Sequence, residues 1–132
     1  MGYISFNPTD ELMVLRLTVG GLNRNSFRNV IVALDTGASD TSIPTKVASD
    51  LGYDLSNPKH LVRLTTGSST VPAKIITVRK LTAIGETVEN IDVLCHDLPE
   101  ESTIDGVLGL NFLRHFDLNI SFSTGIIELQ PY

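Results

Sequence analysis

The chain alternates short apolar runs with small clusters of turn residues, and this pattern predicts a protein built mainly of β-strands. Residues 15–19 alternate apolar and polar side chains with the period of two that a half-buried strand requires. Residues 30–34 are apolar without interruption, which predicts a strand buried on both faces. Further strand-like runs cover residues 61–66, 71–78, 80–84, 88–94, 107–109, 118–122 and 126–129. Many short strands without a repeat or a linker predict an all-β fold, a small closed barrel or a sandwich.

Two short segments carry helical signals instead. Residues 44–51 begin with a proline, which suits the first turn of a helix, and Gly52 follows as a stop signal. Residues 110–116 follow the short strand 107–109 and predict a second helical turn. The chain shows no break in composition, so we expect residues 1–132 to form a single domain.

The composition excludes several classes of protein. Hydrophobic residues make up 42% of the chain and charged residues 19%, which is typical of a globular protein. The formal net charge of −5 argues against nucleic acid or a membrane surface as the partner. The one cysteine, Cys95, cannot form an intrachain disulfide, and no apolar stretch is long enough to span a bilayer. Residues 1–10 lack the pattern of a secretory signal, so with Met1 as the natural start we expect a cytoplasmic protein.

The most specific local pattern is the acidic residue at the end of the buried strand 30–34. Asp35 follows five apolar residues and precedes Thr36 and Gly37. Aspartate is disfavoured in strands and costs free energy when it is buried, so this position needs an explanation. A turn would explain it, because Gly37 can adopt a positive φ. The tripeptide alone does not decide between a turn and a catalytic carboxylate.

The surrounding residues resemble those of a known family. Residues 35–38, Asp-Thr-Gly-Ala after an apolar run, resemble the catalytic signature of the retropepsin-like aspartic proteases. In that family two apolar residues and a glycine follow later, ahead of a helix, and residues 107–109 match this second element. A glycine-tipped hairpin, the flap, lies between the two elements, and residues 64–71 with Gly67 occupy that place. The similarity covers residues 12–129 and is closest to the cellular and bacterial members.

The resemblance implies the small closed barrel of these enzymes, with a flap hairpin and one or two short helices. It also implies an aspartic endopeptidase that needs no cofactor. Hydrolysis of a peptide bond by this chemistry takes two carboxylates, whereas the chain contains one Asp-Thr-Gly and has no room for a second lobe. The pair must then come from Asp35 of each subunit in a two-fold homodimer. The predicted partners are a second copy of the chain and an extended peptide or protein substrate.

The family also suggests roles for the neighbouring residues. Thr36 would brace the two catalytic loops across the dimer axis, and Gly37 would accept a hydrogen bond from the substrate backbone. The implied substrate-binding residues are Ala38, Ser39, Thr66, Gly67, Ser68, Val107 and Leu108. We expect the strand at residues 126–130 to take part in the dimer contacts.

Two departures from the viral pattern affect the expected chemistry. Viral enzymes carry an acidic residue where Ser39 stands and a pairing arginine where Leu110 stands. Both charges are missing together, so no buried charge is left unpaired. Ala38 lacks the hydroxyl that related enzymes place beside the catalytic carboxylate, which predicts a mildly acidic to neutral pH optimum.

The residues also allow an interpretation other than the protease. A dimeric module of the same fold could bind a peptide or protein without cleaving it, because function depends on the site rather than on the fold. Residues 95–97, Cys-His-Asp, are metal-ligand types, but neighbours on a strand point to opposite faces, so no metal site is predicted.

Overall fold

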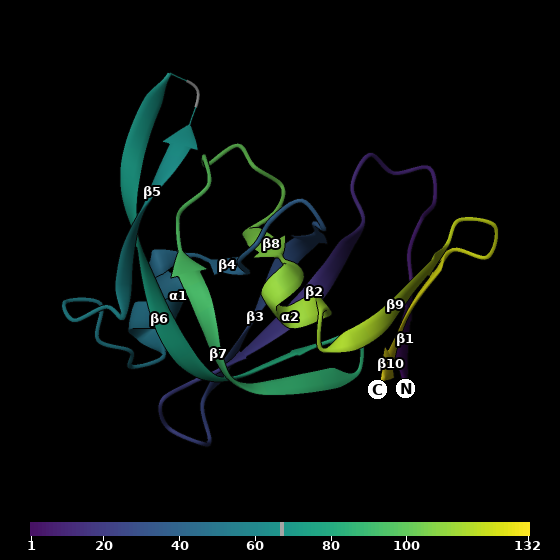
Figure 1. Cartoon of the computed structure of the whole chain (residues 1–132), viewed down its shortest axis with the longest axis horizontal. Coiled ribbons are helices and arrows are strands. Elements are labelled where there is room, and N and C mark those ends of the chain that lie inside the picture. Colours follow the sequence, from purple (N-terminus) through teal and green to yellow (C-terminus); the bar gives the residue numbers. More distant parts are fainter. Residues whose placement is uncertain (67) are drawn as a thin grey trace.

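The computed structural model describes residues 1–66 and 68–132 and shows a closed β-barrel joined to a three-stranded sheet (Figure 1). Strands make up 52% of the structure and helices 8%, which confirms the predicted all-β class. The strands are β1 Gly2–Ser5, β2 Val14–Gly20, β3 Phe27–Leu34, β4 Ser42–Ile43, β5 His60–Thr66, β6 Ser69–Ala83, β7 Glu86–Cys95, β8 Gly106–Leu108, β9 Phe116–Ser121 and β10 Ile126–Pro131. The helices are α1 Thr45–Asp50 and α2 Leu110–Leu113.

Six strands close the barrel. They follow the order β2-β3-β8-β4-β7-β6, and pairing between β6 and β2 completes the ring. Alternate side chains of these strands fill the interior, where Leu17, Val32, Val78 and Val93 have no exposed surface. The ring places β3 and β8 side by side and parallel, with Leu34 opposite Leu108.

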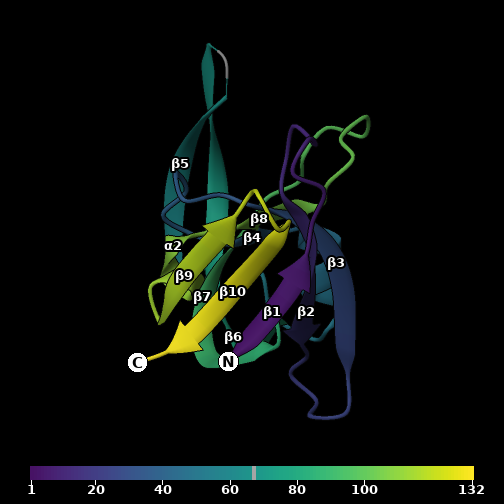
Figure 2. The same cartoon turned by 90° about the vertical axis from the view of Figure 1, so that its right-hand side faces the viewer.

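The middle of the chain differs from the predicted strand boundaries. We expected separate strands at residues 71–78 and 80–84, but β6 runs unbroken from Ser69 to Ala83. The strand changes partner along its length, pairing with β5 as far as Ile75 and with β7 from Lys74 onward. Its first part and β5 form a hairpin that projects from the barrel, on the side opposite the turn between β2 and β3 (Figures 1 and 2).

Three further details depart from the expectations. β3 is buried on both faces only near its end, because Ile31 remains 40% exposed. β4 was not predicted, since two residues are too short to show a period. β1 was not predicted either; it pairs with β10, and Gly2 packs so tightly that a Cβ there would collide with the carbonyl oxygen of Ile84.

The sheet β1-β10-β9 covers one side of the barrel, with both chain ends at the same end of it (Figure 2). Ile127 and Leu129 of β10 have no exposed surface and belong to the main core. β10 is the central strand, hydrogen-bonded to β1 on one side and to β9 on the other. Within the described residues, neither helix has the length and apolar character needed to cross a membrane.

Candidate active site

Asp35 lies at the point where β3 ends, and three backbone bonds fix it there. Its amide donates to the carbonyl of Leu108 at 3.0 Å, which continues the parallel pairing of β3 and β8 by one residue. The amide of Gly37 donates to Asp35 Oδ1 at 2.9 Å, and that of Ala38 to the Asp35 carbonyl at 3.2 Å. The buried strand therefore delivers the carboxylate, and the tight turn after it fixes its direction.

The second element supports the loop that carries Asp35. The amide of Leu110 donates to the carbonyl of Ala38 at 2.8 Å, and the amide of Asn111 to that of Ser39 at 3.1 Å. Gly109 allows this contact, because a Cβ there would lie 2.6 Å from the Asp40 carbonyl oxygen. The glycine of the second element is thus required for the close packing of the loop that carries Asp35.

A buried polar network joins the two elements further. Thr41 has no exposed surface, and its hydroxyl donates to Asn111 Oδ1 at 2.8 Å while its amide donates to the same oxygen at 2.9 Å. The hydroxyl in turn accepts the amide of Gly109 at 3.0 Å. Asn111 and Thr41 were not predicted as site residues. The available signal was a polar Thr41 directly before the buried β4, in a segment that the fold covers completely.

The residues next to Asp35 are open to the surroundings in a single chain. Thr36, Gly37 and Ser39 are exposed, whereas Ala38 is half-buried. Within the described part of the chain, the Thr36 side chain makes no hydrogen bond. These residues therefore present an uncovered surface around the carboxylate.

The remaining predicted site residues fall into two groups. Val107 is half-buried beside β3, but Leu108 has no exposed surface and packs in the core, so it supports the site from beneath. Thr66 ends β5 and Ser68 is exposed in the turn that follows, whereas Gly67 lies outside the described residues. Thr66 and Ser68 therefore lie on the projecting hairpin.

Asp105 has a structural role that its sequence context did not reveal. Its amide donates to the carbonyl of Ile31 at 2.7 Å, and its Oδ2 accepts the amide of Ile31 at 2.8 Å. The residue thereby extends the pairing of β8 with β3 at the end opposite Asp35. These bonds hold β3, which carries Asp35 at its other end, against β8.

Neither metal chemistry nor thiol chemistry finds support in the described residues. No three His, Cys, Asp or Glu side chains among them come together in a way that could hold a metal ion. Cys95 is buried, and burial, followed by the nearby charge of Asp97, raises the pKa of its thiol to about 11. Asp97 Oδ1 accepts a hydrogen bond from the amide of Thr45, the first residue of α1, at 2.8 Å.

Comparison with known proteins agrees with this geometry. The family model described as aspartyl protease matches residues 15–112. Among solved structures, a retropepsin-like aspartic protease from Rickettsia conorii is similar, with a TM-score of 0.68 and 25% sequence identity. The match covers 96% of this chain and 87% of that one. No curated protein sequence matches significantly. The chain therefore belongs to the aspartyl protease family and has the fold of its retropepsin-like members.

Proposed function

We propose that the protein is an aspartic endopeptidase that acts as a homodimer, with one Asp35 from each subunit forming the catalytic pair. The observation that carries the proposal is the fixed carboxylate of Asp35 within an uncovered loop. Its amide and its Oδ1 are both bonded locally, while Thr36, Gly37 and Ser39 remain exposed around it. A loop held this firmly, yet left open, fits a surface that meets its own symmetry mate.

Two Asp35 carboxylates facing each other would supply both functions that peptide hydrolysis needs. Like charges at short range do not both ionise easily, so the pair shares one proton. The ionised member takes a proton from the attacking water, and the protonated member donates a hydrogen bond to the scissile carbonyl. The apparent pKa values then belong to the pair rather than to either residue. No metal and no cofactor enters this reaction.

The terminal sheet limits how two subunits can pair. β10, which we expected to take part in the dimer, already has hydrogen-bonded strands on both of its sides. Pairing between subunits through backbone bonds is therefore left to the outer edges of β1 and β9. β10 can contribute only through its side chains.

The test is cleavage of a diverse peptide mixture, read by mass spectrometry from acidic to neutral pH. Wild type and Asp35→Asn are compared with Asp54→Asn, a matched substitution of an exposed carboxylate in the loop before β5. We expect internal cuts beside apolar residues from wild type and Asp54→Asn, and none from Asp35→Asn. Equal cleavage by Asp35→Asn would refute the mechanism. A folded, dimeric wild type that cuts nothing would favour the non-proteolytic binding module.

A further inference from the structure

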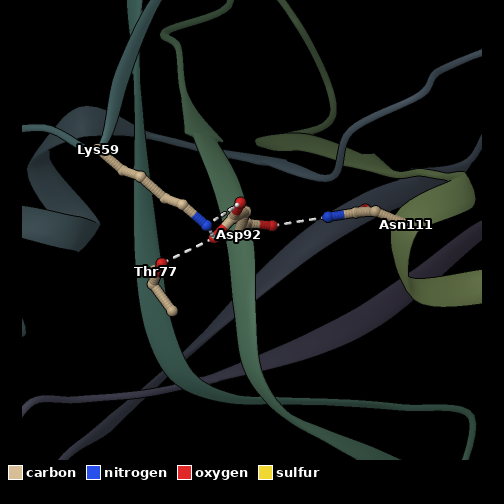
Figure 3. Close-up of polar contacts among 4 residues, drawn as sticks. All are labelled: Lys59, Thr77, Asp92 and Asn111. Atoms are coloured by element: carbon tan, nitrogen blue, oxygen red, sulfur yellow. Dashed lines mark hydrogen bonds and ion pairs between the residues drawn. The ribbon is translucent and has the colours of Figure 1, made fainter.

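Asp92 of β7 contacts residues at the base of the projecting hairpin on one side and Asn111 of α2, which bonds to Thr41 after the loop of Asp35, on the other (Figure 3). Its side chain points toward Lys59 and Thr77, and its backbone carbonyl faces Asn111. We call these four residues, Lys59, Thr77, Asp92 and Asn111, the strut. None of them belongs to the catalytic signature.

On the hairpin side, the strut crosses three adjacent strands. Asp92 Oδ1 accepts the Thr77 hydroxyl at 2.7 Å, and the two residues are direct partners in β7 and β6. Lys59 Nζ reaches Oδ2 at 3.0 Å and Oδ1 at 3.2 Å. Lys59 directly precedes β5, and its amide donates to the carbonyl of Ile75 at 2.8 Å. The ion pair therefore ties the start of β5, the outermost strand of the sheet, across β6 to β7.

On the side of the Asp35 loop, Asn111 of the strut bonds to the part of β7 that the short strand β4 does not reach. β4 has two residues and pairs with β7 only at Leu94 and Cys95. The amide of Leu94 donates to the carbonyl of Thr41 at 2.8 Å, and Asn111 Nδ2 donates to the carbonyl of Asp92 at 2.7 Å. Asn111 Oδ1 then accepts both the amide and the hydroxyl of Thr41.

We propose that Asp92 and Asn111 are positioning residues, which hold the β5–β6 hairpin and the loop of Asp35 in one fixed relation. The inference rests on the proposed function, because it gives the strut the role of aligning the substrate with the catalytic pair. Both ends of a bound peptide segment must be held relative to the reacting carboxylates for efficient hydrolysis. Asp92 serves this purpose through two separate groups, its carboxylate toward the hairpin and its carbonyl toward the loop.

The deciding experiment is amide hydrogen exchange of the full-length protein, because exchange does not depend on activity. In Asp92→Asn we expect residues 60–64 and also residues 38–43 to exchange up to about fivefold faster, the range set by loss of a partly exposed ion pair. Asp50→Asn is the matched control. Its carboxylate also pairs with a lysine, Lys46, at 2.9 Å, and with Arg28 of β3 at 3.0 Å, but it lies on α1 outside the strut. Lys59→Arg keeps the cation and should exchange like wild type.

Peptide cleavage provides a second readout that a purely structural role would not separate. Asp92→Asn should raise KM by about two- to fivefold with little change in kcat, because the inference places the hairpin against bound substrate. Asn111→Asp replaces the donor to Asp92 by an acceptor and should lower kcat by roughly ten- to a hundredfold. The control Asp50→Asn should show neither of these kinetic effects.

The outcomes separate the two proposals. Unchanged exchange at residues 38–43 in Asp92→Asn, from a wild type that cleaves peptides, would overturn the strut and leave the protease intact. A wild type that cleaves nothing would refute the protease and the catalytic purpose of the strut together. Faster exchange at both ends, combined with the split between KM and kcat, would support the inference.

Discussion

The contact between Gly109 and the catalytic loop leads to a quantitative prediction for Gly109→Ala. The new Cβ would lie 2.6 Å from the carbonyl oxygen of Asp40, 2.7 Å from its carbonyl carbon and 2.9 Å from the carbonyl oxygen of Ala38. All three are backbone atoms, so no rotamer change can relieve the crowding. The loop itself has to move.

The size of the movement follows from these distances. Bringing the Asp40 oxygen from 2.6 Å to an ordinary contact of 3.4 Å requires a shift of about 0.8 Å. The bonds from Leu110 to Ala38 and from Asn111 to Ser39 oppose this shift. Overpacking of this kind typically costs about 1–3 kcal/mol of unfolding free energy. Displacement of a catalytic group by about 1 Å can lower the rate by about a hundredfold.

The assay combines urea unfolding with peptide turnover measured well below the unfolding transition. Gly52→Ala is the control, because Gly52 has a φ of +92° but its nearest neighbour would be 3.4 Å from the new Cβ. We expect the control to lose about 1 kcal/mol of stability from backbone strain while keeping wild-type turnover. Gly109→Ala should lose both unfolding free energy and turnover. Wild-type turnover in folded Gly109→Ala would show that the loop does not need this close contact.

Three further predictions concern titration and assembly. The raised pKa of Cys95, about 11, predicts no alkylation by iodoacetamide at neutral pH until urea unfolds the chain; rapid labelling of the native protein would contradict its burial. Burial alone would raise the pKa of Asp92, but hydrogen bonds from Thr77 and Lys59 outweigh it and hold the pKa below the ordinary 3.8. The stability that ionised Asp92 adds to the folded state is therefore present above pH 3.8 and lost as the pH falls through its folded pKa. The difference in urea midpoint between wild type and Asp92→Asn should then vanish in acid, and a difference that persists there would refute this prediction. Activity per molecule should rise with protein concentration as the homodimer assembles, and a constant value wherever sedimentation shows monomer would exclude the shared pair.

The sequence predicted those features that short stretches encode. The strand before Asp35 and the turn at Gly37 are local features, and both form as predicted, although Ile31 of the strand is 40% exposed and Gly37 does not take the positive φ that its turn could have used. The hydrogen bonds between Asn111 and Thr41 join residues 70 positions apart, and the sequence around either residue does not predict the contact with the other. The partner change along β6 was missed for the same reason, because pairing depends on strands elsewhere in the chain.

The bonds between the loop of Asp35 and the second element explain how the chain folds without the charges that viral enzymes carry at the positions of Ser39 and Leu110. Where the viral enzymes pair an acid with an arginine, this chain joins the catalytic loop to the second element through the bonds from Leu110 to Ala38 and from Asn111 to Ser39 and Thr41. These bonds link neutral groups, so dissolved salt screens them much less than it screens exposed ion pairs. These neutral bonds should therefore not weaken as ionic strength rises. Any salt dependence of activity, followed by titrating sodium chloride at fixed dimer fraction, should come from the exposed ion pair of Lys59 and Asp92, and it should be absent from Asp92→Asn.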